Sequence, residues 1–252
     1  MHSDSVKNLS AYADQNHALS LAAARLELYE GKMRKKSKKR NRMIGVALVI
    51  IVLLFGIITV KFIQYEKIIE DTERTWLITQ YGPRDVNSMF YTLYGGKGQL
   101  IVVDGGWTED ADFVRQTIKE MGGKVDAWIL THPHQDHIGA FNAIYSDLQG
   151  IEIKEVYTVD MPSPKLCQER AHWDSVDTYN DFLDLNVKNL KYVYPGDELN
   201  ICGLKVDIYN AYDEHVKELS QDYLNDGSMM FKVQGEKSSM LFCADVGKAM
   251  SD

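Results

Sequence analysis

Residues 131–137, near the middle of the chain, carry the side chains best suited to chemistry. They read Thr-His-Pro-His-Gln-Asp-His and contain the pattern H-x-H-x-D-H, made by His132, His134, Asp136 and His137. The apolar run at residues 127–130 precedes them and predicts a buried strand that ends at this loop. Imidazole nitrogen and carboxylate oxygen together suit Zn²⁺, Mn²⁺ or Fe, because Ca²⁺ and Mg²⁺ take oxygen ligands almost exclusively.

The spacing predicts two divalent metal ions, with zinc favoured. Alternate side chains of such a loop diverge, so we expect His132 and His134 to serve one metal while Asp136 and His137 turn toward a second. Two metals would lower the pKa of a bound water from 15.7 to roughly 7 and polarise the bond that it attacks. The alternative is a polar loop whose histidines cap a following helix, and the rarity of the pattern weighs against it.

The H-x-H-x-D-H pattern after a buried strand resembles the signature of the metallo-β-lactamase superfamily. Residues 101–106 (Ile-Val-Val-Asp-Gly-Gly) are similar to the family's preceding strand-Asp-Gly motif, and residues 241–245 (Leu-Phe-Cys-Ala-Asp) to its later strand, which ends in a metal-bridging Asp. Residues 225–231 (Asn-Asp-Gly-Ser-Met-Met-Phe) resemble the ComEC-like branch, where an Asn/Asp-x-Ser stretch replaces another histidine. The resemblance covers about residues 75–252.

The resemblance implies an α/β fold, an αβ/βα four-layer sandwich of two mixed sheets, preceded here by one transmembrane helix. It implies that His132 and His134 bind metal 1, that Asp136 and His137 bind metal 2, and that Asp245 bridges them. Asp104 would hydrogen-bond a metal-site residue and fix its orientation. A hydroxide between the metals would attack an ester or phosphodiester, with Asp136 accepting or returning a proton. Residues that position substrate or complete the shell of metal 1 would come from Asn225, Asp226 and Ser228.

Two features depart from the family pattern. The family's third histidine for metal 1 is not evident, and His172 and Cys167 are weak candidates for its place. The sequence ends seven residues after Asp245, before the histidine motif that would complete metal 2. We therefore expect these 252 residues to be a fragment that is unstable or weakly active. Cys167, Cys202 and Cys243 are an odd number without close spacing and predict no disulfide, and Cys243 reads as a small core residue.

Residues 43–60 contain no charged side chain and predict a membrane span. As a helix they would be roughly 27 Å long, close to the hydrocarbon thickness of a bilayer. A cleaved signal peptide would have a shorter apolar run and a small-x-small cleavage site, where this chain has Lys61 and Phe62. We expect a basic cytoplasmic tail at 1–42, a transmembrane helix at 43–64, a linker at 65–74 and the hydrolase-like domain at 75–252. The alternative for residues 43–60 is a buried helix of a soluble protein.

The charge distribution supports this order. Residues 32–42 are strongly basic, so the positive-inside rule keeps the N-terminus in the cytoplasm and places the domain on the other side. Contact between this run and anionic lipid is expected. Residues 65–252 hold 17 Lys and Arg against 32 Asp and Glu, a net charge of −15 that lacks the basic footprint of a duplex-binding protein. Nucleic acid is one candidate substrate, although the charge of the domain does not point to it.

A different class of function is a membrane-anchored, non-catalytic metal-binding or interaction module. The two missing ligands would allow it, and metal stoichiometry separates it from the enzyme, since two bound metals favour catalysis.

The patterns along the domain predict covering helices at 110–121 and 138–148 and a helix and loop within 162–185. Predicted strands lie at 89–94, 99–103, 127–130, 151–159, 190–194, 198–201, 204–209, 229–233 and 240–243.

Overall fold

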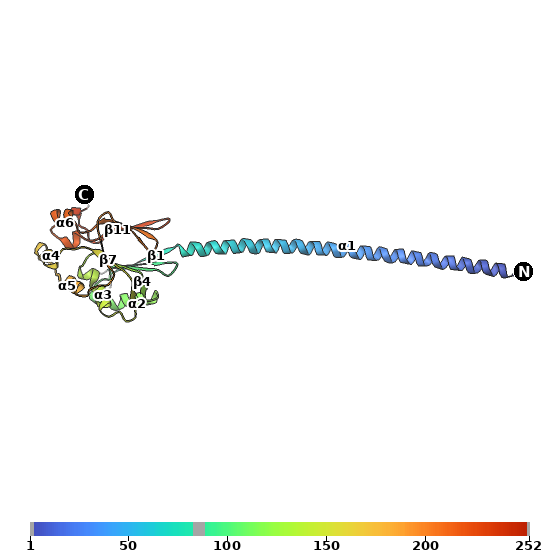
Figure 1. Cartoon of the computed structure of the whole chain (residues 1–252), viewed down its shortest axis with the longest axis horizontal. Coiled ribbons are helices and arrows are strands. Elements are labelled where there is room, and N and C mark those ends of the chain that lie inside the picture. The colour runs from blue at the N-terminus through green and yellow to red at the C-terminus, as the bar shows by residue number, and fades with distance from the viewer. Residues whose placement is uncertain (1–2, 83–88, 251–252) are drawn as a thin grey trace. The chain divides into compact units, whose positions relative to one another are not determined.

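The computed structural model describes residues 3–82 and 89–250, and the chain divides into two units, residues 1–68 and 69–252. The first element is one continuous helix, α1 (Ser3–Glu73) (Figure 1). Residues 3–42 and 65–73, which we expected to be a tail and a linker, are thus helical. No proline precedes residue 83, so nothing in this stretch removes a helical hydrogen bond.

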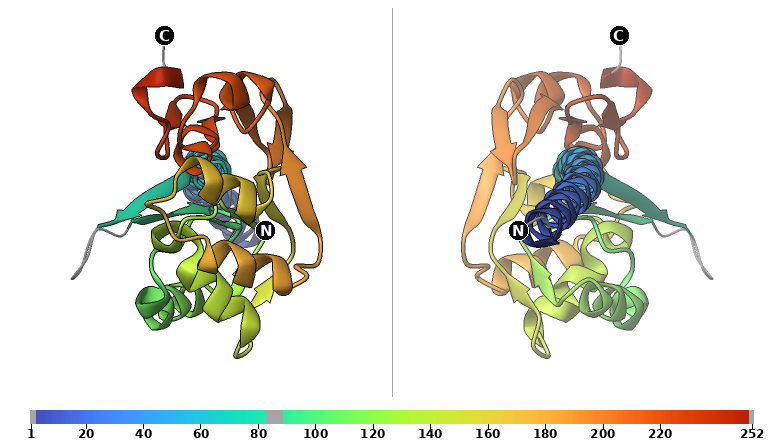
Figure 2. Two further views of the ribbon diagram at one scale, coloured as in Figure 1. Left: turned by 90° about the vertical axis from the view of Figure 1, so that its left-hand side faces the viewer. Right: turned by 90° about the vertical axis from the view of Figure 1, so that its right-hand side faces the viewer.

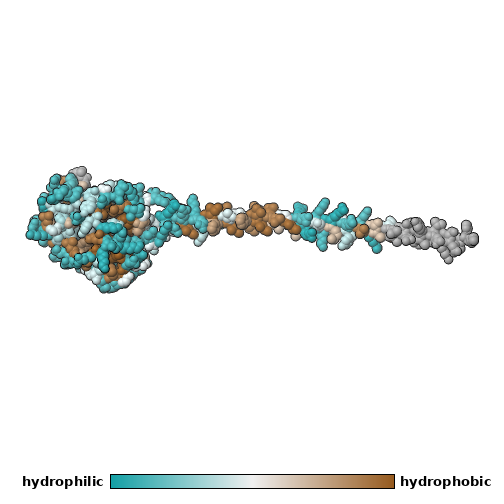
Figure 3. All heavy atoms as spheres, in the orientation of Figure 1, coloured by the Kyte–Doolittle hydropathy of each residue, from teal (hydrophilic) through white to brown (hydrophobic). Residues whose placement is uncertain are grey.

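One described helix is long and apolar enough to cross a bilayer by length and composition, and it lies near the N-terminus. Its apolar band is flanked on both sides by polar residues (Figure 3). A membrane span and a signal sequence share these properties, whereas a core helix would be buried; none of the apolar window is buried within the protein.

The larger of two main sheets has six strands in the order β1-β2-β3-β5-β7-β8. Strands β1, β2 and β3 pair antiparallel, and β3, β5, β7 and β8 run parallel. Their bounds are β1 (Trp76–Tyr81), β2 (Phe90–Gly95), β3 (Leu100–Val103), β5 (Ala127–Ile129), β7 (Val156–Val159) and β8 (Leu190–Val193). Strand β1 has no counterpart among the predicted strands, because its half-exposed edge position leaves a weak pattern.

The second sheet has four strands in the order β12-β11-β10-β9, all antiparallel. The bounds are β9 (Glu198–Ile201), β10 (Leu204–Asn210), β11 (Met230–Gln234) and β12 (Ser239–Phe242). The predicted α/β class with two sheets is confirmed, with one correction: the first sheet is mixed and the second is antiparallel in the described residues. A separate parallel pair joins β4 (Lys124–Val125) to β6 (Glu152–Ile153).

Helices α2 (Ala111–Glu120), α3 (Gln135–Ser146) and α5 (Asp177–Asp184) lie together on one side of the larger sheet (Figure 2). The rings of Trp128 in β5 and Phe141 in α3 pack edge to face with centroids 5.1 Å apart, a contact that joins this helical layer to the sheet. The shorter helices are α4 (Pro164–Arg170), α6 (Glu214–Leu219) and α7 (Tyr223–Asp226), with 3₁₀ turns at Thr108–Asp110 and Lys248–Met250.

The two sheets are joined by an aromatic contact across their inner faces. Phe242 of β12 stacks on Phe231 of β11 at 4.7 Å and meets Tyr91 of β2 at 5.0 Å. Because β12 is thereby packed against the larger sheet, the residues that follow its end are brought to the edge where β3 and β5 end.

Candidate metal centre

The loop that carries the H-x-H-x-D-H pattern is clamped to the end of the neighbouring strand. Strands β3 and β5 are parallel, so their carboxyl ends meet at one edge of the sheet. Asp104 follows β3 there with its side chain turned to Thr131: Oδ1 accepts from Thr131 N at 2.8 Å and Oδ2 from Thr131 Oγ1 at 2.9 Å. Trp128 Nε1 donates to Asp104 O at 2.9 Å. Asp104 has φ of 56°, a conformation that Asp and Asn tolerate better than most residues.

Asp104 also holds His137 in place. His137 Nδ1 lies 2.9 Å from Asp104 Oδ2, which turns Nε2 toward Asp245 Oδ1 at 3.5 Å and Asp136 Oδ2 at 3.9 Å. Burial by itself lowers the pKa of His137, but the charge and hydrogen bond of Asp104, together with Asp245, outweigh it and raise that pKa to about 10. The hydrogen bond from His137 in turn lowers the pKa of Asp245. The expected orienting contact of Asp104 with a site histidine is thus present in the geometry.

His132 presents one ring nitrogen to the site. It is fully buried, and burial, with the nearby His137 and His134, holds its pKa well below the usual value, so its imidazole is neutral. Its Nδ1 lies 3.1 Å from Thr131 Oγ1, whose single hydrogen goes to Asp104. Nδ1 must therefore donate, and the lone pair of His132 Nε2 points at His134 Nδ1, 2.9 Å away.

Four of the five predicted metal residues, His132, His134, His137 and Asp245, lie next to one another. Ligand atoms of His132, His137 and Asp245 lie within 4.8 Å of one another, and His132 also faces His134. Asp136 stands at the margin, one-third exposed, with its nearest described ion-pair partner in His137. Ala244, at φ of 46°, turns the chain after β12 so that Asp245 enters the cluster.

Asp174 and Asp222 are near the cluster although the sequence patterns did not single them out. Asp174 Oδ2 lies 3.0 Å from His134 Nε2, and ligand atoms of His134, Asp174 and Asp222 lie within 4.8 Å of one another. Asp174 belongs to the stretch at 162–185 that we expected to lie over the site, but no motif marks it. Its proximity to His134 depends on how the loop between α4 and α5 folds back.

The weaker ligand candidates have other contacts. The His172 ring meets Trp173 at 5.1 Å, and neither His172 nor Cys167 belongs to a potential ligand group among the described residues. Cys167 Sγ donates to Pro162 O, and burial raises the pKa of this thiol to about 12. Cys243 is exposed, so its prediction as a core residue is wrong: it follows the last paired residue of β12, where the chain leaves the sheet.

The segment with Asn225, Asp226 and Ser228 frames the site. Asp226 accepts from Gly247 N at 3.1 Å and Ser220 Oγ at 2.6 Å, which engages both of its oxygens. Ser228 is fully buried, and its Oγ has no partner in the described part of the chain. The next residue, Met229, donates its N–H to Thr131 O at 2.8 Å. The Met229 hydrogen bond joins this segment to the loop that carries the H-x-H-x-D-H pattern. The role of Asn225, Asp226 and Ser228 toward substrate or metal stays a prediction.

A pocket of about 270 Å³ opens onto this cluster. Its lining includes Met89, Tyr91, Asp104, His137, Cys243 and Asp245. The pocket walls thus contain the carboxylate of Asp104, the cluster residues His137 and Asp245, and the side chains of Met89 and Tyr91.

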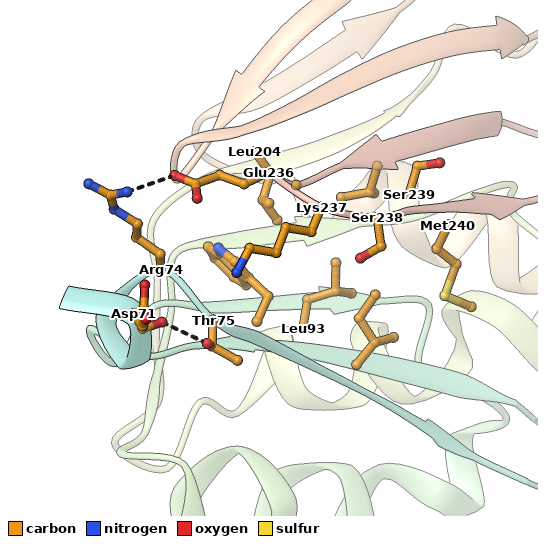
Figure 4. A pocket seen from close by; sticks show the side chains of 14 residues that line it. Asp71, Arg74, Thr75, Leu93, Leu204, Glu236, Lys237, Ser238, Ser239 and Met240 are labelled. Atoms are coloured by element: carbon orange, nitrogen blue, oxygen red, sulfur yellow. Dashed lines mark hydrogen bonds and ion pairs between the residues drawn. The ribbon is translucent and has the colours of Figure 1, made fainter. Parts of the chain in front are cut away.

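A second pocket, of about 250 Å³, lies between the β1-β2 edge and the turn that joins β11 to β12 (Figure 4). Arg74 and Glu236 form an ion pair at 3.6 Å on one side of it, and Leu93 and Leu204 line it from opposite sides. Its lining includes no histidine or cysteine, so the chemistry concentrates in the first pocket.

The comparisons with known proteins agree with this geometry. Residues 81–196 match the model of the metallo-beta-lactamase superfamily. The chain is 26% identical over 172 residues to RNase aCSPSF2 of Saccharolobus solfataricus, covering 66% of this chain and 32% of the relative. It is 29% identical over 121 residues to a hydroxyacylglutathione hydrolase of Aliivibrio fischeri, covering 46% of each. The chain thus spans a third to a half of the length of these curated relatives.

Among solved structures, a metallo-beta-lactamase from Staphylococcus aureus aligns with a TM-score of 0.44 and 14% identity, covering 68% of this chain and 43% of that one. The family match and the two-sheet topology identify the metallo-β-lactamase fold, preceded by one long apolar helix, and they support assignment to that superfamily. The names of these relatives do not confirm the ComEC-like branch, which stays a prediction.

Proposed function

We propose that residues 75–252 form a metal-dependent hydrolase of the metallo-β-lactamase superfamily that cleaves an ester or phosphodiester bond. The observation that carries this proposal is the convergence of His132, His134, His137 and Asp245 into one cluster, of which His137 and Asp245 line a pocket. These residues come from segments more than a hundred positions apart, and buried titratable groups gathered in a pocket are typical of functional sites.

The side chains fit divalent metal ions. His132 Nε2 and His134 Nδ1 face each other at 2.9 Å in a buried place, and a His134 that donates from Nε2 to Asp174 presents a second lone pair there, an arrangement that a cation would stabilise. His132 and His134 would hold one ion, and His137, Asp136 and Asp245 would contribute to a second. The nitrogen and oxygen donors favour zinc, with manganese or iron as alternatives. When bound, such ions supply Lewis-acid polarisation and an activated water.

The chain's own residues provide orientation and proton transfer. Asp104 fixes His137 so that Nε2 faces the pocket. Asp136, one-third exposed beside His137, is placed to take a proton from the attacking water and return it to the leaving group. The lining of Tyr91 and Met89 offers an apolar wall for the substrate.

The substrate class follows from chemistry and charge together. The curated relatives are named as an RNase and as hydroxyacylglutathione hydrolases, so hydrolysis is what their names share. A net charge of −15 on residues 65–252 disfavours a long polyanion, which requires many lysine and arginine contacts. We propose a small ester or phosphodiester and regard nucleic acid as less favoured.

We also propose that the protein is anchored in a membrane by residues 43–64, with its N-terminus cytoplasmic and the domain extracytoplasmic. The apolar band of α1 and the basic run at 32–42 support this orientation. The basic run would also contact anionic lipid on the cytoplasmic face.

The test uses the full chain in detergent micelles, with bound metal measured by mass spectrometry and hydrolysis measured on bis-p-nitrophenyl phosphate and p-nitrophenyl acetate. We expect two metals per chain and turnover of at least one substrate, with metal and turnover reduced in His134→Ala. His215→Ala is the matched control, because His215 is exposed outside the site. Metal without turnover would indicate the non-catalytic module, and a chain that takes up no metal would refute the proposal.

A further inference from the structure

We propose that Asp174 is a positioning residue that sets the tautomer of His134 and thereby aims its Nδ1 at a metal ion. The inference rests on the proposed metal-dependent function. It starts from the two contacts of one imidazole ring: His134 Nε2 lies 3.0 Å from Asp174 Oδ2, and His134 Nδ1 lies 2.9 Å from His132 Nε2.

The first contact determines where the proton of a neutral His134 lies. An ionised carboxylate only accepts hydrogen bonds, so the contact with Asp174 requires the hydrogen on Nε2. In a neutral imidazole the other nitrogen then carries a lone pair, here Nδ1. The structure thus directs a metal-binding nitrogen of His134 toward the same place as the lone pair of His132 Nε2.

The arrangement repeats, on the opposite ring nitrogen, the contact that holds His137. There Asp104 Oδ2 accepts from Nδ1 and leaves Nε2 to face Asp245. A carboxylate on the outer nitrogen of a metal-binding histidine fixes both ring orientation and tautomer and raises ligand basicity. Asp104 orients one histidine of the cluster, and Asp174 orients another.

The surroundings leave Asp174 available for this task. Among the described residues its ion pair is with His134, and its side chain is 26% exposed. Its backbone N–H donates to Ala171 O at 2.9 Å, which closes the turn after α4 and presents the carboxylate. Asp174 is therefore held by its own loop and oriented toward the site.

Asp222 lies in the same group but is occupied differently. Its Oδ1 accepts from Asn225 N at 3.2 Å and its Oδ2 from Asn225 Nδ2 at 2.8 Å, so it caps the start of α7. It adds negative charge near His134 without replacing Asp174. The competing arrangement is a cation held by His134 Nε2, Asp174 and Asp222, whose ligand atoms lie within 4.8 Å of one another.

The experiment compares wild type, Asp174→Asn, Asp174→Glu and the control Asp181→Asn as full chains in detergent micelles. Asp181 is exposed on α5, so Asp181→Asn removes one negative charge near the same loop without touching His134. Histidine-labelled ¹⁵N spectra of the zinc-loaded chains report the tautomer of His134, assigned by its loss in His134→Ala. Zinc and cobalt titrations report affinity and stoichiometry, and the cobalt spectrum reports the ligand field.

In wild type we expect the Nε2–H tautomer of His134. In Asp174→Asn we expect a 10- to 100-fold loss of affinity for one ion and an altered cobalt spectrum. In Asp174→Glu we expect the metal affinity to recover in part. The control should match wild type. An Nδ1–H tautomer in wild type, or unchanged affinity and spectrum in Asp174→Asn, would overturn the inference, as would loss of a third bound ion, which would favour the competing cation site. A wild type that takes up no metal refutes the proposed function, whereas metal uptake with an Nδ1–H tautomer of His134 refutes only the role of Asp174.

Discussion

Replacing Asp104 by Asn tests the contact on which the site geometry most depends. Asp104 is 5% exposed and accepts hydrogen bonds from Thr131 N, Thr131 Oγ1 and His137 Nδ1. Asn keeps an oxygen for Thr131 N but places an amino group where Oδ2 was, opposite His137 Nδ1–H. Asn also tolerates the φ of 56°, so the variant changes the hydrogen bonding and leaves backbone strain nearly unchanged.

The magnitude follows from the lost charged contact. A hydrogen bond to a charged group contributes about 1.5–3 kcal/mol, and the Thr131 hydroxyl can rotate to a new partner whereas the His137 ring cannot. For a domain of this size each kcal/mol corresponds to about 2–4 °C in Tm, so metal-free Asp104→Asn should melt roughly 3–12 °C below wild type. Metal affinity should also fall about 10- to 100-fold because His137 is no longer oriented.

The assay is thermal unfolding followed by tryptophan fluorescence, on metal-free full chains in detergent, with metal titrations in parallel. Asp181→Asn is the control for loss of one negative charge at an exposed position. A melting temperature within about 1 °C of wild type, combined with unchanged metal affinity, would show that Asp104 does not orient His137 and would refute the reasoning.

Three further predictions concern pH, packing and topology. The pKa of His137 is about 10 in the folded chain against an ordinary 6.5, so its contribution to the stability of the metal-free chain is complete below about pH 6.5 and is lost as pH rises toward 10. The melting temperature should therefore fall as pH rises from 6.5 to 10. A melting temperature that stays constant over this range would contradict the prediction. Gly139→Ala should destabilise the fold by about 1–3 kcal/mol, because its Cβ would meet Thr108 N at 2.6 Å, and an unchanged melting temperature would show that the backbone yields there. Exposed Cys243 should react in intact cells with a membrane-impermeant maleimide while buried Cys167 does not, and labelling only after cell breakage would place the domain in the cytoplasm.

Most of the fold was accessible from sequence periodicity. The strands at 89–94, 99–103 and 204–209 correspond to β2, β3 and β10, because apolar residues gather where strands are buried on one or both faces. Edge strand β1 was not predicted, since none of its residues is fully buried and the apolar pattern is weak. The continuity of α1 (Ser3–Glu73) was not predicted, because its charged stretches carry no amphipathic pattern that would separate them from irregular chain.

The sequence by itself identified the candidate metal residues of the site. The H-x-H-x-D-H spacing identified the histidines and Asp136, and the later strand-Asp motif identified Asp245. This was possible because neighbouring residues of a loop must share a location, and because the resemblance linked the distant motif to it.

Only the tertiary structure decided which groups surround those residues. The parallel pairing of β3 and β5 brings Asp104 to Thr131 and His137, and the fold of the loop before α5 brings Asp174 to His134 across 40 positions. Contacts of this kind carry no local signal, because a single Asp in a polar loop looks the same whether it faces water or a histidine. The carboxylate partners of His137 and His134 therefore follow from these long-range contacts.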